Sequence, residues 1–207
     1  MVSGADGTAG RTAADGTAGR TRAAEETAGL AGAAGAAGDA AERAAERARE
    51  VVSRVVDPEL PMLTLADLGV VRGVEADAAG AVTVSLTPTY SGCPALAEMR
   101  ATVDARLREA GFADVRVRTV LDPPWTTDWI TPAGRRALAE HGIAPPGPRP
   151  PGRGPVPLTL GPVRRAVPCP RCGSRATEEV ARFSGTACRA LRRCAECREP
   201  FEHLKEI

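Results

Sequence analysis

The sequence predicts an α+β fold, in which a small mixed sheet with helices is followed by an all-β domain. Residues 40–143 show the order helix, two strands, helix, strand, and residues 144–162 hold eight prolines and four glycines. Four paired cysteines follow near the C-terminus. We therefore expect a disordered low-complexity extension over 1–38, an α+β domain over 40–143, a Pro/Gly-rich linker over 144–165 and a cysteine-rich β domain over 166–207.

The α+β domain begins with a helical pattern from Ala40. An apolar stripe near the end of this helix consists of Val51, Val52, Val55 and Val56. Asp57 precedes Pro58, and a residue before proline is pushed out of the α region. We therefore expect the helix to stop there.

Alternating apolar residues predict strands over 69–75, 81–87 and 114–121. Residues 94–110 carry apolar residues at helical spacing, and Gly111 is the expected end of that helix. Thr131 and Pro132 predict a short helix that runs to about Glu140, because proline is favoured at the first helical position.

The first 38 residues contain almost no apolar side chains larger than alanine, and one octad occurs at both 5–12 and 14–21. A solenoid repeat needs apolar residues to bury, which these copies lack. We therefore interpret this segment as a disordered extension. A mitochondrial address is the weaker alternative, because acidic residues are present.

The charge balance gives no attraction of the whole chain to nucleic acid or to an anionic membrane, since 27 basic residues face 26 acidic ones. The sequence contains no run of about 18 apolar residues, so it does not predict a membrane span. The N-terminus also lacks the basic and then apolar order of a secretory signal. We therefore expect a cytoplasmic protein with reduced cysteines, where paired cysteines bind metal more often than they form disulfides.

The cysteines near the C-terminus form two Cys-x2-Cys pairs separated by 21 residues: Cys169 with Cys172, and Cys194 with Cys197. This spacing is typical of a structural zinc ribbon, in which four thiolates hold one ion tetrahedrally. A domain of about 40 residues buries little apolar area and needs the metal to fold. Zinc is favoured over an iron–sulfur cluster because evenly paired cysteines suit a single ion.

Three further features of this domain remain open from the sequence. Cys188 is interpreted as a buried small hydrophobe or as a second functional thiol. His203 is expected at the surface, with a spare ligand role as the alternative. The basic cluster is expected to be a solvated face rather than a nucleic-acid contact, and it consists of Arg189, Arg192, Arg193 and Arg198.

Cys93 carries the second chemical signal, because it lies between a predicted strand and a predicted helix in a Pro/Gly-rich turn. With Pro94 at the first helical position, the thiol would face the positive end of the helix, which favours the thiolate. Thr87, Thr89 and Ser91 place hydroxyl groups nearby. A reactive or metal-binding thiolate is one interpretation, and a structural cysteine that caps a helix is the other.

Two further loops are candidates to support this cysteine. Asp57 and Glu59 follow the first helix, and Asp67 precedes the first strand. Their carboxylates would orient groups or bind iron transiently, or they would act as cap and turn residues. Trp125 and Trp129 follow the third predicted strand. We expect them either to form a docking surface or to cover the edge of the core.

These motifs taken together resemble the iron–sulfur assembly domain of the SufT-like type: Asp57-Pro58-Glu59, Asp67-Leu68-Gly69, Thr87-Pro88-Thr89, Gly92-Cys93-Pro94 and Pro123-Pro124-Trp125. The added zinc ribbon narrows the resemblance to the PaaD family, the accessory proteins of phenylacetyl-CoA epoxidase. This resemblance covers about residues 43 to 207 and excludes the N-terminal extension.

The resemblance implies an accessory subunit of a multicomponent oxygenase rather than an enzyme. Its implied role is to assist assembly of iron–sulfur or di-iron centres in partner subunits of the epoxidase complex, especially the iron–sulfur reductase subunit. Cys93 would then handle iron or a cluster transiently, in a homodimer with Cys93 of a second protomer. The chain has no Glu-x-x-His pair, which a di-iron carboxylate site of its own would need.

The main alternative is a non-catalytic docking module of the complex, in which the ribbon binds a partner and Cys93 is structural. A thiol oxidoreductase that uses a Cys-x2-Cys pair and a nucleic-acid-binding ribbon are weaker alternatives. The near-zero net charge counts against the last of these.

Overall fold

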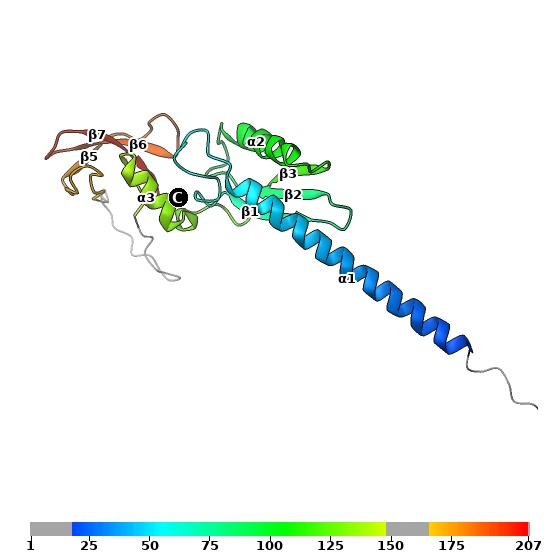
Figure 1. Cartoon of the computed structure of the whole chain (residues 1–207). Coiled ribbons are helices and arrows are strands. Elements are labelled where there is room, and N and C mark those ends of the chain that lie inside the picture. The colour runs from blue at the N-terminus through cyan, green and yellow to red at the C-terminus, as the bar shows by residue number, and fades with distance from the viewer. Residues whose placement is uncertain (1–17, 148–165, 207) are drawn as a thin grey trace, which may run out of the picture. The chain divides into compact units, whose positions relative to one another are not determined.

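The computed structural model describes residues 18–147 and 166–206, and it divides the chain into two units, residues 1–40 and 41–207. Helix α1 (Ala18–Ser53) runs from the first unit into the second (Figure 1). It begins at Ala18, so the part of the expected disordered extension from residue 18 onward is helical. Alanine, the best helix former, is the commonest residue of this segment, whereas the glycines at 29, 32, 35 and 38 lower its helix propensity. Residues 1–17 lie outside the described residues.

The first sheet is mixed, as predicted. Strands β1 (Val71–Ala76) and β2 (Val82–Leu86) pair antiparallel, and β3 (Val115–Thr119) pairs parallel to β2. Helix α2 (Leu96–Glu109) supplies the crossover that a parallel pair requires. Gly111 follows it with φ of 92°, in the left-handed region that glycine adopts without strain, and ends the helix as predicted.

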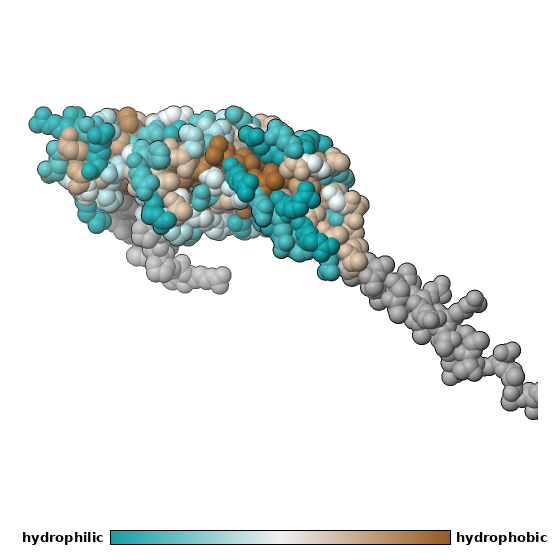
Figure 2. Space-filling model, viewed as in Figure 1, coloured by the Kyte–Doolittle hydropathy of each residue, from teal (hydrophilic) through white to brown (hydrophobic). Residues whose placement is uncertain are grey.

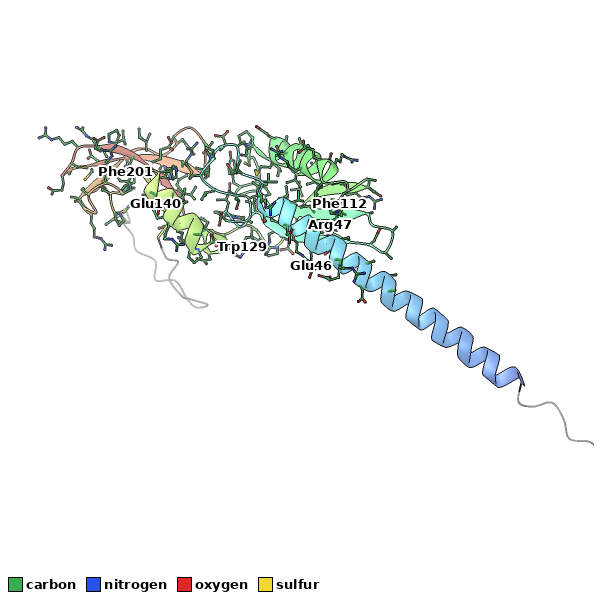
Figure 3. The ribbon with its side chains drawn as sticks, in the orientation of Figure 1. Glu46, Arg47, Phe112, Trp129, Glu140 and Phe201 are labelled. Atoms are coloured by element: carbon green, nitrogen blue, oxygen red, sulfur yellow. The ribbon has the colours of Figure 1, made fainter. Side chains whose placement is uncertain are left out.

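The core of this domain forms between the sheet and the apolar faces of α1 and α2. Helix α2 buries Met99, Val103 and Leu107, and β2 buries Val82 and Val84. The last turns of α1 contribute Ala48 and Val52. Figure 3 shows Arg47 of α1 beside Phe112, where the guanidinium carbon lies 5.0 Å from the ring centroid.

The end of α1 differs from the predicted one. The helix stops at Ser53, and Val55 and Val56 follow it in an extended turn, where Val56 bridges Thr64. Val55 is buried and Val56 is half exposed, so the predicted stripe faces the core only in part. The earlier stop leaves Asp57 at the head of a separate loop that turns into the core.

The segment after β3 is anchored by tryptophan. Trp125 is buried, and its Nε1–H donates to the Leu68 carbonyl at 3.0 Å. A short 3-10 helix, η1 (Thr127–Trp129), leads to α3 (Pro132–Glu140), which is capped by Thr131 and has proline in its first turn, as predicted. Trp129 packs under Arg72, 3.5 Å from guanidinium carbon to ring centroid. Both tryptophans therefore cover the core.

The C-terminal domain is all-β and joins the first domain through a shared sheet. Its strands are β5 (Thr177–Ala181), β6 (Arg189–Cys194) and β7 (Pro200–Leu204). The two-residue strand β4 (Ile143–Ala144) pairs parallel to β7, which gives the order β4-β7-β6-β5. Ala144 therefore belongs to a sheet rather than to the expected linker, of which 148–165 lies outside the described residues.

Most of the face seen in Figure 2 is hydrophilic, and a short hydrophobic stretch interrupts it. Among the residues that the structure describes, the exposed large apolar side chains are those of Val56, Leu121, Val180 and Phe183. Within the part of the chain that the structure describes, no helix is both long and apolar enough to cross a membrane.

Candidate functional site

The four cysteines of the ribbon lie together. Their Sγ atoms are all within 4.8 Å of one another, with 3.7 Å between Cys169 and Cys197 and 3.6 Å between Cys172 and Cys194. Four sulfurs at about 2.3 Å from a tetrahedral ion lie about 3.8 Å apart. The geometry therefore fits one metal ion held by four thiolates.

Each pair of cysteines sits in a tight turn whose backbone approaches the sulfurs. Gly173 follows the first pair with φ of 73°, and Arg198 follows the second with φ of 63°. The backbone N–H of Cys197 is the largest influence on Cys194 and lowers the pKa of that thiol to about 7. In the same turn the backbone N–H of Glu199 lowers the pKa of Cys197, but burial and the neighbouring cysteines outweigh it and raise that pKa to about 12. Without a metal the four thiols therefore do not ionise together, and an ion that binds all four must displace protons.

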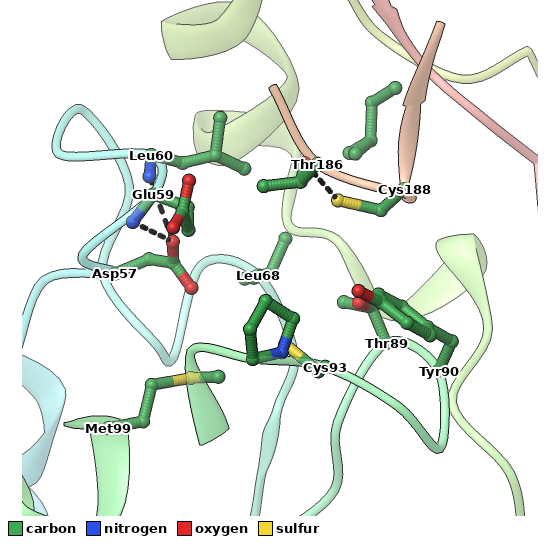
Figure 4. A pocket seen from close by; sticks show the side chains of 12 residues that line it. Asp57, Glu59, Leu60, Leu68, Thr89, Tyr90, Cys93, Met99, Thr186 and Cys188 are labelled. Atoms are coloured by element: carbon green, nitrogen blue, oxygen red, sulfur yellow. Dashed lines mark hydrogen bonds between the residues drawn. The ribbon is translucent and has the colours of Figure 1, made fainter. Parts of the chain in front are cut away.

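A cavity lies where the ribbon meets the first domain (Figure 4). The first domain contributes Asp57 and Glu59 from the loop after α1, and Thr89 and Cys93 from the loop between β2 and α2. The ribbon contributes Thr186 and Cys188. The structure therefore brings Asp57, Glu59, Thr89 and Cys93 around one space, together with a cysteine that the sequence alone did not place in any site.

Asp57 closes the loop after α1. Its Oδ1 atom accepts the backbone N–H groups of Glu59 and Leu60, each at 2.8 Å, as expected for an Asx turn. The residue is only 3% exposed. Burial raises the pKa of this carboxyl against the lowering effect of the two N–H groups, and the negative Glu59 raises it further.

The position of Cys93 relative to helix α2 differs from the predicted one. Helix α2 begins at Leu96 with Ala95 as its N-cap, so Pro94 lies before the helix rather than at its first position. The backbone N–H groups of Ala95 and Leu96 do lower the pKa of the thiol. However, burial has the larger effect, Cys188 and Asp57 add to it, and the net result is a raised pKa. The free thiol is therefore held protonated, contrary to the expected thiolate.

The two remaining predicted residues, Asp67 and Thr87, lie outside the cavity. Asp67 accepts from the hydroxyls of Thr64 and Thr131 at 2.7 and 2.8 Å, so it links the loop before β1 to the cap of α3. These bonds lower its pKa, with Thr64 the largest influence. Thr87 is buried, and its hydroxyl has no hydrogen-bond partner among the described residues.

For the ribbon, one expectation is wrong and another holds only in part. His203 is buried rather than at the surface, and burial lowers its pKa to about 4, with the positive Arg192 as the next cause. The basic cluster is solvated only at Arg193 and Arg198. Arg192 is buried and lies 3.7 Å from Glu179. The guanidinium nitrogens of Arg189 lie 2.7 Å from a carboxylate oxygen of Glu202 and 3.5 Å from one of Glu59, which belongs to the first domain.

Cys188 was not predicted in this site, because its position depends on how the ribbon meets the first domain. Cys188 immediately precedes β6 and packs against the main core. One signal was available from the sequence: Cys93 and Cys188 are the two cysteines outside the paired motifs.

Comparisons with known proteins agree with this architecture. Residues 45–121 match the family described as iron-sulfur cluster assembly protein, and residues 153–205 match the family described as PaaD zinc beta ribbon domain. The chain is 45% identical over 157 residues to a protein of Escherichia coli (strain K12) that is described as one of the subunits of 1,2-phenylacetyl-CoA epoxidase. That match covers 76% of this chain and 90% of the relative.

Shorter relatives match the first domain alone. The Fe-S protein maturation auxiliary factor SufT of Staphylococcus aureus (strain USA300) is 37% identical over 87 residues, which cover 41% of this chain and 96% of the relative. The factor YitW of Bacillus subtilis (strain 168), of the same description, is 32% identical over 98 residues, covering 47% and 95%. The chain combines an assembly-type domain with a cysteine ribbon, and its epoxidase relative is matched over 90% of that relative's length. The chain therefore belongs to the PaaD family.

Proposed function

We propose that this chain is an accessory maturation factor of a phenylacetyl-CoA epoxidase complex. It would assist assembly of iron–sulfur or di-iron centres in partner subunits, with the iron–sulfur reductase subunit as the first candidate. The observation that carries the proposal is that Cys93 and Asp57 line one cavity in a domain of the iron–sulfur assembly family. The cargo, iron or a cluster, is a substrate that the chain passes on.

The cavity supplies the chemistry that transient handling needs. A thiol and a carboxylate offer a soft and a hard ligand to iron. The raised pKa of Cys93 means that iron must displace a proton to bind, so the bound ion is released more readily than from a preformed thiolate. A carrier needs this property, since it must give up what it holds.

The ribbon cysteines have a separate role in this proposal. Their ion is zinc, which binds four thiolates tetrahedrally and has no redox chemistry. All four positions are filled by protein, so the ion is closed to substrate and serves folding of the ribbon. The chain itself would catalyse no oxygenation, and it would act in the cytoplasm beside the complex.

A genetic complementation experiment tests this function. Cells that lack the chain would be supplied with the wild-type sequence, with Cys93→Ser or with the control Ser91→Ala, since Ser91 is exposed and does not line the cavity. We expect Cys93→Ser to lower both epoxidase activity and the iron content of the purified partner subunits, while Ser91→Ala restores both. Full activity and normal metal content with Cys93→Ser would refute the proposal.

A docking module with a structural Cys93 is the second candidate, and the partial packing of Cys93 against the core favours it. In that case Cys93→Ala would leave partner maturation intact, whereas Cys169→Ser would abolish binding to the complex. The same strains, with a pull-down of the partner subunits, separate the two functions.

A further inference from the structure

The cavity is completed by the ribbon. Figure 4 shows Asp57 and Cys93 on one side of it and Thr186 and Cys188 on the other. Leu204 of β7 also lines the cavity and belongs to the same buried core as the first domain. The ribbon is therefore built into this site, rather than tethered beside it.

Several contacts fix the ribbon cysteine in this place. The Thr186 Oγ1 atom lies 3.0 Å from the Cys188 Sγ atom, and the backbone N–H of Lys205 donates to the Cys188 carbonyl at 2.9 Å. The next residue, Arg189, lies within 4.0 Å of both Glu202 in the ribbon and Glu59 in the first domain. Cys188 is thus held at the junction from both sides.

The buried carboxylate at this junction keeps one oxygen available. Asp57 is 97% buried, and its two short hydrogen bonds are both accepted by Oδ1. No hydrogen bond to its Oδ2 atom is found among the described residues. Among the described residues, the fully enclosed side-chain atoms without a partner belong to Thr87, Arg192 and His203, so the Oδ2 atom of Asp57 is open to the cavity that this residue lines. A cation in the cavity would be a partner for this oxygen.

The size of the cavity limits what it can hold. The volume of the cavity is about 20 Å³, counted as the space that the centre of a water-sized sphere can occupy. About 10–15 Å³ on this measure holds a single water molecule. One metal ion therefore fits, whereas a two-iron cluster with its two sulfides does not fit without opening the site.

We propose that Cys188 of the ribbon and Cys93 of the first domain together bind a single ferrous ion, with Asp57 supplying a carboxylate oxygen. This inference rests on the proposed function, because the ion would be the cargo that the chain delivers. Binding would release both thiol protons to solvent and leave the ion in the ferrous state, so no electron is transferred.

The ligand atoms of Cys93, Cys188 and Asp57 do not all lie within 4.8 Å of one another, so these side chains must move together to hold the ion. Among the described residues, the ribbon cysteines are the one group of three or more ligand atoms within 4.8 Å of one another. The second thiolate then comes from the same chain, whereas the hypothesis made from the sequence paired Cys93 with Cys93 of a second protomer. The two arrangements predict different stoichiometries, namely one iron per chain and one iron per two chains.

Anaerobic titration of the zinc-loaded full chain with ferrous iron tests the inference. The readouts are iron per chain, the thiolate-to-iron charge-transfer absorption and zinc content, which reports an intact ribbon. Cys188→Ser, Cys93→Ser and the control Ser91→Ala would be compared. We expect one iron per wild-type chain, and an affinity at least about 10-fold weaker in each cysteine variant, since removing even a group that only supports a ligand costs that much.

The outcomes distinguish the inference from the function. If Cys93→Ser weakens binding and Cys188→Ser does not, or if one iron binds per two chains, the inference is wrong and the proposed function stands. If neither cysteine variant changes iron binding, both are wrong. Reconstitution with iron and sulfide that gives two irons and two acid-labile sulfides per chain would overturn the single-ion assignment.

Discussion

His203 links a single buried side chain to the pH dependence of stability. Burial lowers its pKa from about 6.5 to about 4, so the folded protein keeps the ring neutral while the unfolded chain binds a proton. Protons therefore favour unfolding, and the stabilisation present above pH 6.5 is lost as the pH falls toward 4. We expect a loss of roughly 1–3 kcal/mol across this window.

Chemical unfolding of the zinc-loaded protein at a series of pH values measures this slope. The variant His203→Gln removes the titrating group and would flatten the part of the slope that belongs to it. An unchanged slope in His203→Gln would show that other groups carry the acid sensitivity.

Cys93 has the opposite behaviour, because its pKa is raised. Since only the thiolate reacts with iodoacetamide, we expect its alkylation to keep accelerating above pH 9.0, the ordinary pKa of a thiol. Mass spectrometry of the Cys93 peptide against pH measures the midpoint. Asp57→Asn removes a negative charge that raises this pKa, so the midpoint would move down. A wild-type midpoint below 9.0 would mean that the pKa of Cys93 is lowered, as predicted from its position before a helix.

At the scale of elements, the turn between Leu68 and β1 depends on a glycine. Gly69 has φ of 74°, and a Cβ atom there would lie 2.5 Å from the Trp129 carbonyl oxygen. Gly80, in the turn between β1 and β2, has φ of 85° with nothing within 4 Å of such an atom. An alanine would adopt an unfavourable positive φ at either position, but its Cβ atom would clash with Trp129 only at position 69.

The substitutions Gly69→Ala and Gly80→Ala therefore form a matched pair. We expect Gly80→Ala to cost about 1–2 kcal/mol from the left-handed backbone alone. Gly69→Ala would cost a further ~1–3 kcal/mol, because the loop that carries Trp129 must shift. Urea unfolding curves compare them, and equal costs would mean that the Trp129 contact is easily displaced.

The elements that the sequence predicted are those with local signals. Gly111 ends α2 and Thr131 caps α3, because caps are decided within a few neighbouring residues. Strand β4 was missed because two residues become a strand only through β7, which lies far along the chain. The start of α1 was missed because repeated Ala-rich sequence was taken as disorder despite its helix propensity.

The candidate site divides in the same way. Asp57, Glu59 and Cys93 were predicted as neighbours from short motifs that each lie in one loop. Cys188 joins them only when the ribbon packs on the first domain, which depends on contacts such as Arg189 with Glu59. The raised pKa of Cys93 was missed for a related reason, since burial and the charge of Asp57 come from other elements.

At the scale of the whole molecule, the metal of the ribbon is expected to protect the cavity in the other domain. A ribbon without its ion loses its fold, and the wall that Thr186 and Cys188 supply is lost with it. We therefore expect a strong chelator, or Cys169→Ser, to speed alkylation of Cys93 several-fold at constant pH. Peptide mapping by mass spectrometry identifies the modified cysteine. An unchanged rate would show that the cavity does not depend on the ribbon.

The proposed delivery of iron through Cys93 can be measured as transfer from a loaded donor. The protein would be loaded anaerobically with radioactive iron, mixed with metal-free epoxidase subunits and separated from them after a fixed time. We expect iron to move to a partner subunit, activity to appear with it, and Cys93→Ser to transfer no more than free iron does. Equal transfer by Cys93→Ser and by the wild-type chain would show that Cys93 does not carry the iron.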